Sequence, residues 1–214
     1  MADELVFYTN PMSRGRIVRW MLEELGEPYR TEVLGFGPPM KSKTYLAVNP
    51  MGKVPALKHG DWTVTEAAAI CAYLADVFPD AKLAPESGDR LRGPYYRWMF
   101  FAAGPLEQAA TNKTFGFTVP PDREGMAGYG TMAAVINALE GAVSKSEYIV
   151  GDRFSAADVY VGAHIGWGMQ FGTVEKRPAF ERYWERISTR PAARRAKEID
   201  DALMPKEERT AAAN

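Results

Sequence analysis

Cysteine, histidine and long apolar runs are all scarce in this chain of 214 residues, and each scarcity excludes a class of protein. The single cysteine, Cys71, excludes an internal disulfide framework and a Cys-x-x-Cys redox centre. The two histidines, His59 and His164, lack the spacing of metal ligands, so we expect no metal site. No apolar run approaches the ~18 residues that a membrane-spanning helix requires.

An excess of charge of one sign is also missing. The formal net charge is −1 at pH 7, which gives no indication of a nucleic-acid partner or of binding to an anionic membrane. The acidic residues 1–4 lead directly into an apolar run, so we expect no signal peptide and a cytoplasmic location. Hydrophobic residues make up 46% of the chain, which is ordinary for a globular protein and enough for sizeable cores.

The first 80 residues alternate between strand-like and helix-like patterns. The predicted elements are a buried strand at 5–9, a helix capped by Ser13 and ended by Gly26, a strand at 29–34, a helical turn at 45–47, short strands at 54–57 and 62–64, and a helix from an N-cap at Thr65 to about Phe78. This order of strands and helices is thioredoxin-like.

Beyond a linker at 80–89, every pattern is helical. Helices are expected from about Arg90, with a bend at Gly104-Pro105, from about Asp122 to Val143, from Ser155 to about Phe171, and after Pro178 and Pro191. Residues 155–158 have the spacing of a capping box, and the low charge of the helix that follows predicts the middle of a bundle. We therefore predict an α/β domain at 1–80 and an all-α domain at 89–214.

The segment 49–57 combines turn signals with a short extended run, Val-Pro-Ala-Leu. The proline keeps Val54 out of helical conformations and cannot donate to a sheet ladder, so the Val54 backbone is expected to face outward. Such an edge can pair with an extended peptide. The helix start at Glu66 adds free N–H groups for a carboxylate and an acidic side chain for an ammonium group. Together these features predict a receptor for a small zwitterionic peptide.

These residues resemble the glutathione transferase family. Its thioredoxin-like domain carries an Asn-Pro-x-Gly-x-Val-Pro segment with a cis proline, which residues 49–55 match fully. An acidic residue and a serine then open a helix, and here Glu66 matches while Ala67 replaces the serine. A Gly-Asp pair before the family's capping box is matched by residues 151–152. The resemblance covers nearly the whole chain and implies a glutathione transferase fold and a homodimer.

The resemblance also implies a role for each residue of a glutathione site. Glu66 would hold the γ-glutamyl ammonium group, the Ala67 N–H the adjacent carboxylate, and the Val54 backbone the cysteinyl unit. The candidates for the glycine carboxylate are Lys53 and Lys41, with Lys43 as a substitute for Lys41. The missing serine hydroxyl removes a charge-assisted hydrogen bond worth roughly 1.5–3 kcal/mol, so we expect a weaker affinity.

The glutathione thiol must become a thiolate before it can attack an electrophile. Lowering its pKa by about two units requires roughly 2.7 kcal/mol, which one hydroxyl hydrogen bond and the positive end of a helix can supply. The resemblance implies a donor in the strand-to-helix loop, and Ser13 is our candidate. The register relative to Arg16 varies within the family, so Asn10 and Tyr8 are alternatives. Cys71 is expected in a helix on an apolar face, where it would be inert.

Three arginines, Arg14, Arg16 and Arg19, lie at the start of the first predicted helix, where the helix dipole disfavours cations. They predict acidic neighbours, either in a ligand or in a partner.

The leading hypothesis is a detoxification enzyme, a glutathione transferase that uses glutathione as co-substrate and adds its thiolate to a hydrophobic electrophile. Peroxidase or isomerase activity in the same site is a variant. The alternative is a non-catalytic relative that serves as a protein-interaction module. The presence of Lys53, Val54 and Glu66 favours the enzyme, because an interaction module does not need them.

Overall fold

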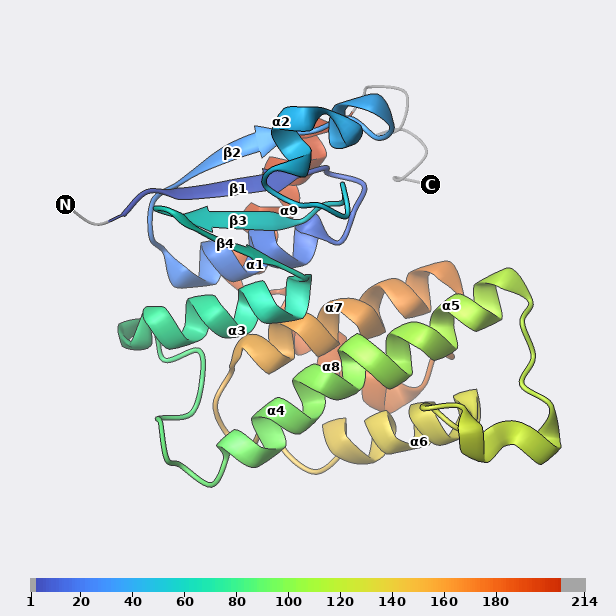
Figure 1. Cartoon of the computed structure of the whole chain (residues 1–214). Helices are drawn as coiled ribbons and strands as arrows, with labels where there is room; N and C mark the ends of the chain where they lie inside the picture. The colour runs from blue at the N-terminus through green and yellow to red at the C-terminus, as the bar shows by residue number, and fades with distance from the viewer. Residues whose placement is uncertain (1–2, 205–214) are drawn as a thin grey trace. The chain divides into compact units, whose positions relative to one another are not determined.

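The strand β1 (Leu5–Thr9) lies inside a four-stranded sheet in our computed structural model, which describes residues 3–204 (Figure 1). The other strands are β2 (Tyr29–Val33), β3 (Ala56–His59) and β4 (Trp62–Thr65), and the order in the sheet is β2-β1-β3-β4. β1 is parallel to β2 and antiparallel to β3, and β3 forms a hairpin with β4. The predicted buried strand at 5–9 is confirmed, since its apolar residues are almost fully covered.

The helices α1 (Gly15–Leu25) and α3 (Ala67–Val77) contact each other and pack on the sheet (Figure 1). The core between these layers consists of fully buried apolar side chains, including Phe7, Ile17, Leu22, Leu57 and Ile70. A 3-10 helix (Pro38–Lys41) and the short α2 (Lys43–Leu46) connect β2 to β3. Gly26 ends α1 as predicted, with φ of 78° and its N–H bonded to the Leu22 carbonyl.

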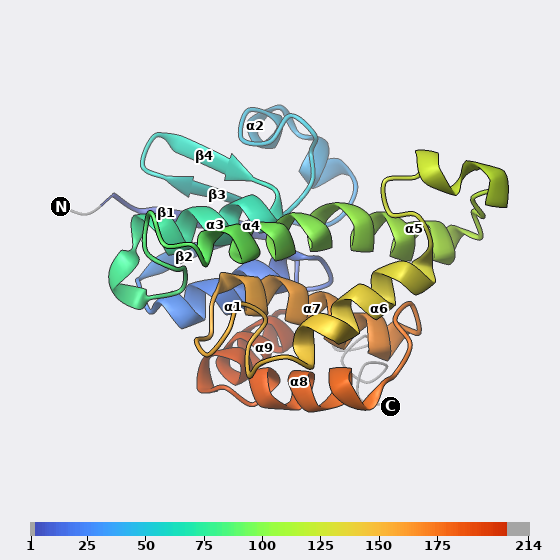
Figure 2. The ribbon, with the colours of Figure 1, turned by 90° about the horizontal axis from the view of Figure 1, so that it is seen from below.

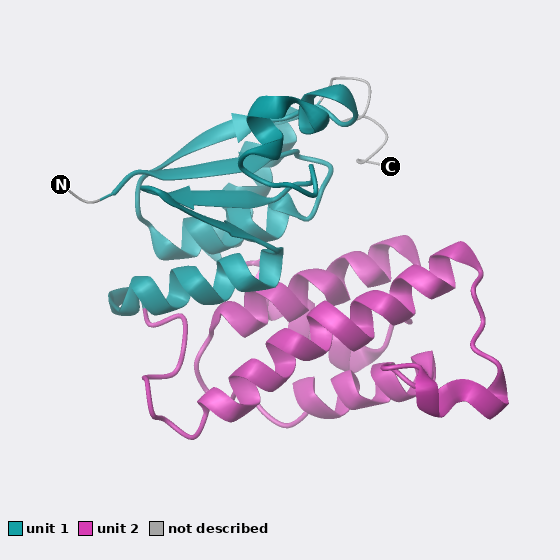
Figure 3. Cartoon of the chain, in the orientation of Figure 1, with its two compact units in different colours: residues 1–81, 190–214 teal, residues 82–189 magenta. Residues whose placement is uncertain are grey.

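The described residues form two compact units (Figure 3). Unit 1 consists of residues 3–81 and 190–204, and unit 2 consists of residues 82–189. The C-terminal helix α9 (Pro191–Leu203) therefore belongs to unit 1, where it contacts α1. This grouping differs from the predicted boundary, which placed all of 89–214 in the helical domain. The reason is that α9 buries Ala192, Ala196 and Asp200 in unit 1.

Over residues 82–189, helices connected by loops make up unit 2 (Figure 2). Its helices are α4 (Arg92–Phe101), α5 (Glu107–Phe115), α6 (Met132–Val143), α7 (Ala156–Phe171) and α8 (Pro178–Ser188). The helix α7 is buried over most of its length and contacts both α4 and α8, as its low charge predicts. The predicted capping box at its start is present, with Ser155 and Asp158 bonded reciprocally.

Two predicted helices of unit 2 differ from the structure. The helix expected from Asp122 begins only at Met132, because the Thr131 hydroxyl caps it and the preceding residues 121–126 form a 3-10 helix. At Gly104-Pro105 the chain forms a π-helical segment (Ala102–Leu106) between α4 and α5, since Pro105 has no N–H for the regular ladder. Among residues 3–204, no helix combines the length and apolarity needed to cross a bilayer.

Candidate functional site

Three segments of unit 1 meet at one end of its sheet because of the register of the strands. Tyr8 of β1 is paired with Ala56 of β3, and Ala56 is paired with Thr65 of β4. The residues just beyond these pairs are therefore neighbours, namely the loop after β1, the segment Val54–Pro55 and the start of α3. The register thus brings together the segments that contain most of the predicted site residues.

The Val54 backbone lies just outside the sheet ladder. The Val54–Pro55 peptide bond is cis, and β3 begins only at Ala56. Within residues 3–204, no hydrogen bond uses the Val54 N–H or carbonyl. The preceding Lys53 carbonyl is fixed by two donors, the Tyr45 hydroxyl at 2.6 Å and the Asn49 amide at 2.7 Å. The edge at Val54 is therefore both open and held in place.

Tyr45 and Asn49, to which the sequence analysis assigned no role, support this edge through their hydrogen bonds to the Lys53 carbonyl. Both are buried, and Asn49 also closes its own turn by accepting the Met51 N–H at 3.0 Å. Burial raises the pKa of Tyr45 to about 12, so its hydroxyl stays protonated and can donate to the Lys53 carbonyl. Asn49 could have been found from its place in the motif, whereas nothing in the local pattern marks Tyr45.

Glu66 lies directly before α3 in a strained conformation. Its φ of 66° and ψ of 120° cost of the order of 1–3 kcal/mol for a residue with a side chain. Its exposed carboxylate makes no capping hydrogen bond, and the first N–H to bond back is that of Ile70, to the Glu66 carbonyl at 2.9 Å. Within residues 3–204, the Ala67 N–H has no partner, as expected for a first helical turn. A carboxylate thus stands beside free N–H groups.

The predicted N-cap at Thr65 is wrong. Thr65 is the last residue of β4, where pairing with Ala56 holds it extended. The chain therefore turns into α3 one residue later, and Glu66 takes the N-cap position.

Of the three candidate lysines, Lys41 has a described contact with the turn at 49–52. Its ammonium group donates to the Met51 carbonyl at 2.8 Å. A Cβ at Gly52, whose φ is 57°, would lie 2.8 Å from the same ammonium group, so glycine permits this approach. The Lys53 side chain is exposed in the same turn, and Lys43 is exposed at the start of α2.

The loop after β1 contains two of the three candidate donors to the thiol. The Ser13 hydroxyl donates to the Asn10 carbonyl at 2.7 Å and accepts the Gly15 N–H at 3.0 Å. The helix itself starts at Gly15, so Ser13 supports the turn before α1 instead of being its N-cap residue. The Asn10 amide donates to the Leu34 carbonyl at 2.8 Å. Both donors are thus engaged with backbone carbonyls.

The third candidate, Tyr8, is half-buried in β1, with its ring 5.6 Å from that of Tyr45. Its hydroxyl has no hydrogen-bond partner within the part of the chain that the structure describes. Tyr8 therefore differs from Ser13 and Asn10 in having a donor that is already available.

Cys71 is fully buried in α3, and burial raises the pKa of its thiol. This position agrees with the predicted inert core cysteine. His59 is the last residue of β3, where its Nδ1 lies 2.9 Å from the Tyr73 hydroxyl, and His164 lies on α7 with its Nδ1 3.5 Å from Glu107. Over residues 3–204, no three histidine, cysteine or acidic side chains are grouped as metal ligands would be.

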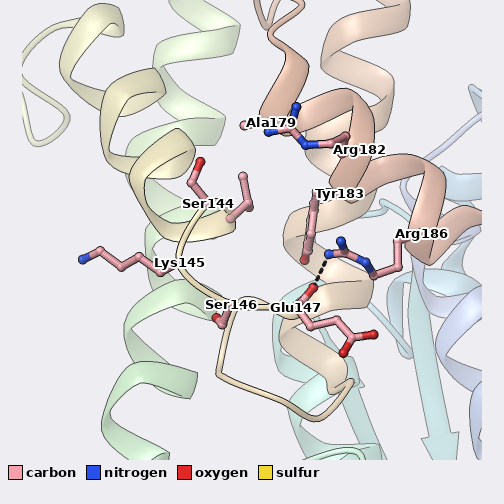
Figure 4. A pocket seen from close by; sticks show the side chains of 9 residues that line it. Ser144, Lys145, Ser146, Glu147, Ala179, Arg182, Tyr183 and Arg186 are labelled. Atoms are coloured by element: carbon pink, nitrogen blue, oxygen red, sulfur yellow. Dashed lines mark hydrogen bonds between the residues drawn. The ribbon is translucent and has the colours of Figure 1, made fainter.

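A pocket of about 480 Å³ lies in unit 2, between the end of α6 and one face of α8 (Figure 4). Arg182 and Arg186 line it, and Arg186 donates to the Glu147 carbonyl at 2.6 Å. None of the predicted site residues belongs to it. With exposed guanidinium groups and little apolar surface, it is unsuited to a hydrophobic electrophile.

Comparison with known proteins points to one family. A family model described as the glutathione S-transferase N-terminal domain matches residues 12–77, and one described as the C-terminal domain matches residues 108–191. A glutathione S-transferase of Arabidopsis thaliana is 31% identical over 170 residues, covering 69% of this chain and 74% of the relative. Glutathione S-transferase GstB of Escherichia coli is 29% identical over 184 residues, covering 81% of this chain and 88% of the relative.

A solved structure agrees with these matches. The crystal structure of a glutathione transferase from Phanerochaete chrysosporium, in complex with oxidized glutathione, superposes with a TM-score of 0.77 at 27% identity. It covers 94% of this chain and 98% of its own.

Proposed function

Since the chain belongs to the glutathione S-transferase family and is itself a glutathione transferase, we propose that unit 1 binds glutathione and that the thiolate is added to a hydrophobic electrophile. The observation that carries this proposal is the meeting of the open Val54 backbone with the Glu66 carboxylate at one end of the sheet. An extended peptide with an ammonium group and two carboxylates fits these groups.

Each end of glutathione has a partner in this arrangement. The Val54 N–H and carbonyl would pair with the cysteinyl unit as a strand pairs with a sheet edge. Glu66 would hold the γ-glutamyl ammonium group, and the Ala67 N–H the carboxylate beside it. At the other end, Lys53 and Lys41 would hold the glycine carboxylate, which the contact of Lys41 with the turn at 49–52 supports.

The chemical step needs the thiol to lose its proton to solvent and the thiolate to attack. A donor from the loop after β1 would stabilise the sulfur anion by a charge-assisted hydrogen bond. Ser13 is our candidate, with Asn10 and Tyr8 as the alternatives. In the product, the glutathione sulfur is bonded to the electrophilic carbon, and any leaving group departs with the electron pair of the bond that breaks.

Calorimetric titration of glutathione tests this proposal. We expect saturable binding to the native protein and binding at least about tenfold weaker for Glu66→Ala, since a hydrogen bond to a charged group is worth about 1.5–3 kcal/mol. Glu27→Ala is the matched control, because Glu27 is equally exposed in unit 1 but lies after α1, away from the three segments. No binding by the native protein would contradict the enzyme and favour the interaction module, which would also pass through a column of immobilised glutathione.

We also propose a homodimer in the cytoplasm. Family membership supports the dimer, and so do Tyr96 and Phe100, which lie one turn apart on α4 with 40% and 72% of their surfaces exposed. The single cysteine, which is free, is consistent with a reducing compartment.

A further inference from the structure

Arg16, in the first turn of α1, connects the loop after β1 to the C-terminal helix α9. Its Nε donates to the Pro11 carbonyl, while its Nη2 lies 2.8 Å from an Asp201 carboxylate oxygen and 2.9 Å from the Met204 sulfur. Arg16 and Met204 are 188 positions apart in the sequence, yet both belong to unit 1. One guanidinium group thus joins the end of the chain to the loop that carries two candidate thiol donors.

The group that Arg16 holds is the peptide between Pro11 and Met12. Arg16 binds its carbonyl, and the Asn10 side chain accepts its N–H at 2.9 Å. The Asn10 carbonyl in turn accepts the Ser13 hydroxyl at 2.7 Å. The positions of Asn10 and Ser13 therefore both depend on the orientation of this one peptide group.

Arg16 and Asp201 each carry a charge that the dipole of its own helix disfavours. Arg16 lies at the positive start of α1, and Asp201 lies near the negative end of α9. Each charge compensates the other, and Lys197 adds a second cation 2.5 Å from Asp201. Although burial opposes ionisation, the hydrogen bonds from Lys197 and Arg16 lower the pKa of Asp201, which is therefore ionised at neutral pH.

We propose that Asp201 of α9 and Met204, the residue directly after this helix, are positioning residues for the activation of the glutathione thiol. Through Arg16 they hold the Pro11–Met12 peptide, and thereby the loop donor, in the orientation that the thiol requires. This inference rests on the function proposed above. The contacts assigned to glutathione binding lie on other segments, around Val54 and Glu66, so the link acts on turnover and leaves affinity unchanged.

Asp201→Asn tests the link by keeping the shape of the side chain and removing its charge. With glutathione and chlorodinitrobenzene, we expect kcat at neutral pH to fall about fivefold, the scale of one partly exposed ion pair. The rise of kcat/KM with pH should shift to higher pH by about half a unit, because a misplaced donor stabilises the thiolate less. Calorimetry should give a Kd for glutathione within about twofold of the native value.

Arg195→Gln is the matched control. Arg195 also joins α9 to α1, through Glu23 at 3.2 Å, but at the opposite end of α1 from the loop. This variant should keep the native kcat and pH profile. Asp201→Glu should recover most of the activity. Met204→Leu, which removes the contact of Arg16 with the sulfur, should change the profile in the same direction as Asp201→Asn.

An unchanged kcat and pH profile in Asp201→Asn would overturn the inference. A fivefold loss of kcat in Arg195→Gln would also overturn it, because α9 would then affect turnover only by stabilising unit 1. If Asp201→Asn does not fold, Met204→Leu decides in the same way. If the native protein does not bind glutathione in calorimetry, both the proposed function and this inference are overturned. Intact binding with an unchanged profile would overturn the inference alone.

Discussion

The hydroxyl of Ser13 already has a use in the folded chain, because it donates to the Asn10 carbonyl at 2.7 Å. A hydrogen bond between neutral groups contributes about 1 kcal/mol net, whereas one to a charged group contributes about 1.5–3 kcal/mol. A thiolate within reach would therefore compete successfully for this proton. The hydroxyl needs only to rotate about its Cβ–Oγ bond, and its acceptance of the Gly15 N–H at 3.0 Å can persist.

Ser13→Ala should therefore lower turnover by at least about tenfold with little change in the Kd for glutathione, since the lost bond forms mainly with the thiolate. Steady-state kinetics and calorimetry measure the two quantities separately. Tyr8→Phe is the informative comparison, because the Tyr8 hydroxyl has no partner among residues 3–204. Unchanged turnover in Ser13→Ala, with a loss in Tyr8→Phe, would transfer the role to Tyr8.

A second prediction at this scale concerns Tyr45, whose hydroxyl holds the Lys53 carbonyl. Tyr45→Phe leaves that carbonyl with Asn49 as its donor, so the Val54 edge should loosen and the Kd for glutathione should rise about threefold to tenfold. Calorimetry at neutral pH checks this value. A Kd equal to that of the native protein would show that Asn49 alone suffices.

The same residue gives an expected dependence of stability on pH. Burial raises the pKa of Tyr45 to about 12, so its neutral form is favoured in the folded state. That stabilisation is fully present below the ordinary tyrosine pKa of ~10 and is lost as the pH rises from there toward 12. Urea unfolding across this range should show a shallower loss of stability for Tyr45→Phe than for the native protein.

At the scale of elements, the turn from β1 into α1 depends on the absence of a side chain at Gly15. A Cβ there would lie 2.0 Å from the Thr9 hydroxyl oxygen and 3.0 Å from that of Ser13. Gly15→Ala should lower the free energy of unfolding by about 1–3 kcal/mol, as overpacking does, and should also lower turnover by displacing Ser13. Urea denaturation and kinetics check the two effects.

The control for this substitution is Gly141→Ala, in the last turn of α6. A Cβ at Gly141 meets no atom within 4 Å, so the better helix propensity of alanine should raise the stability by about 0.5–1 kcal/mol. Equal effects of the two substitutions would show that the turn into α1 accommodates a Cβ at position 15, which would contradict the prediction.

The sequence predicted the elements of unit 1 well, because apolar strands and glycine or proline boundaries are local signals. It predicted the start of α3 wrongly, since Thr65 is paired with Ala56 as the last residue of β4, and the local pattern does not contain this pairing between distant segments. The family motif at residues 49–55 could be identified from the sequence. The contact of the Tyr45 hydroxyl with the Lys53 carbonyl could not be predicted, because it joins residues eight positions apart across a turn.

At the scale of the whole molecule, the sequence predicted helix in the C-terminal half but not which helices belong together. Arg16 and Arg19 do have acidic neighbours, but these are Asp201 and Asp200 of the chain's own α9 and not groups of a ligand or a partner, as the sequence analysis predicted. Periodicity shows that α9 has a buried face but not what covers it. In the structure α9 packs on α1, and the two helices are joined by a buried ion pair between Arg19 and Asp200 at 3.1 Å, which sequence patterns do not reveal.

The proposed homodimer is tested by sedimentation. We expect the native protein to sediment at twice the chain mass, and Phe100→Asp to shift it toward monomer, because burying an unpaired carboxylate in an interface is costly. Phe117→Asp is the control, since Phe117 is similarly exposed in unit 2 but lies beyond the end of α5. A native monomer would refute the proposal.

The place of α9 in unit 1 has a consequence for how the protein is made. On the ribosome, the first 81 residues emerge early, but the face of α1 that receives α9 stays bare until residues 190–204 have been translated. The whole of unit 2 is synthesised in between, which takes on the order of ten seconds. Nascent chains should therefore need a chaperone for that interval. Transcripts that end before α9 should yield products that the cell degrades, even though they encode every residue assigned here to glutathione binding.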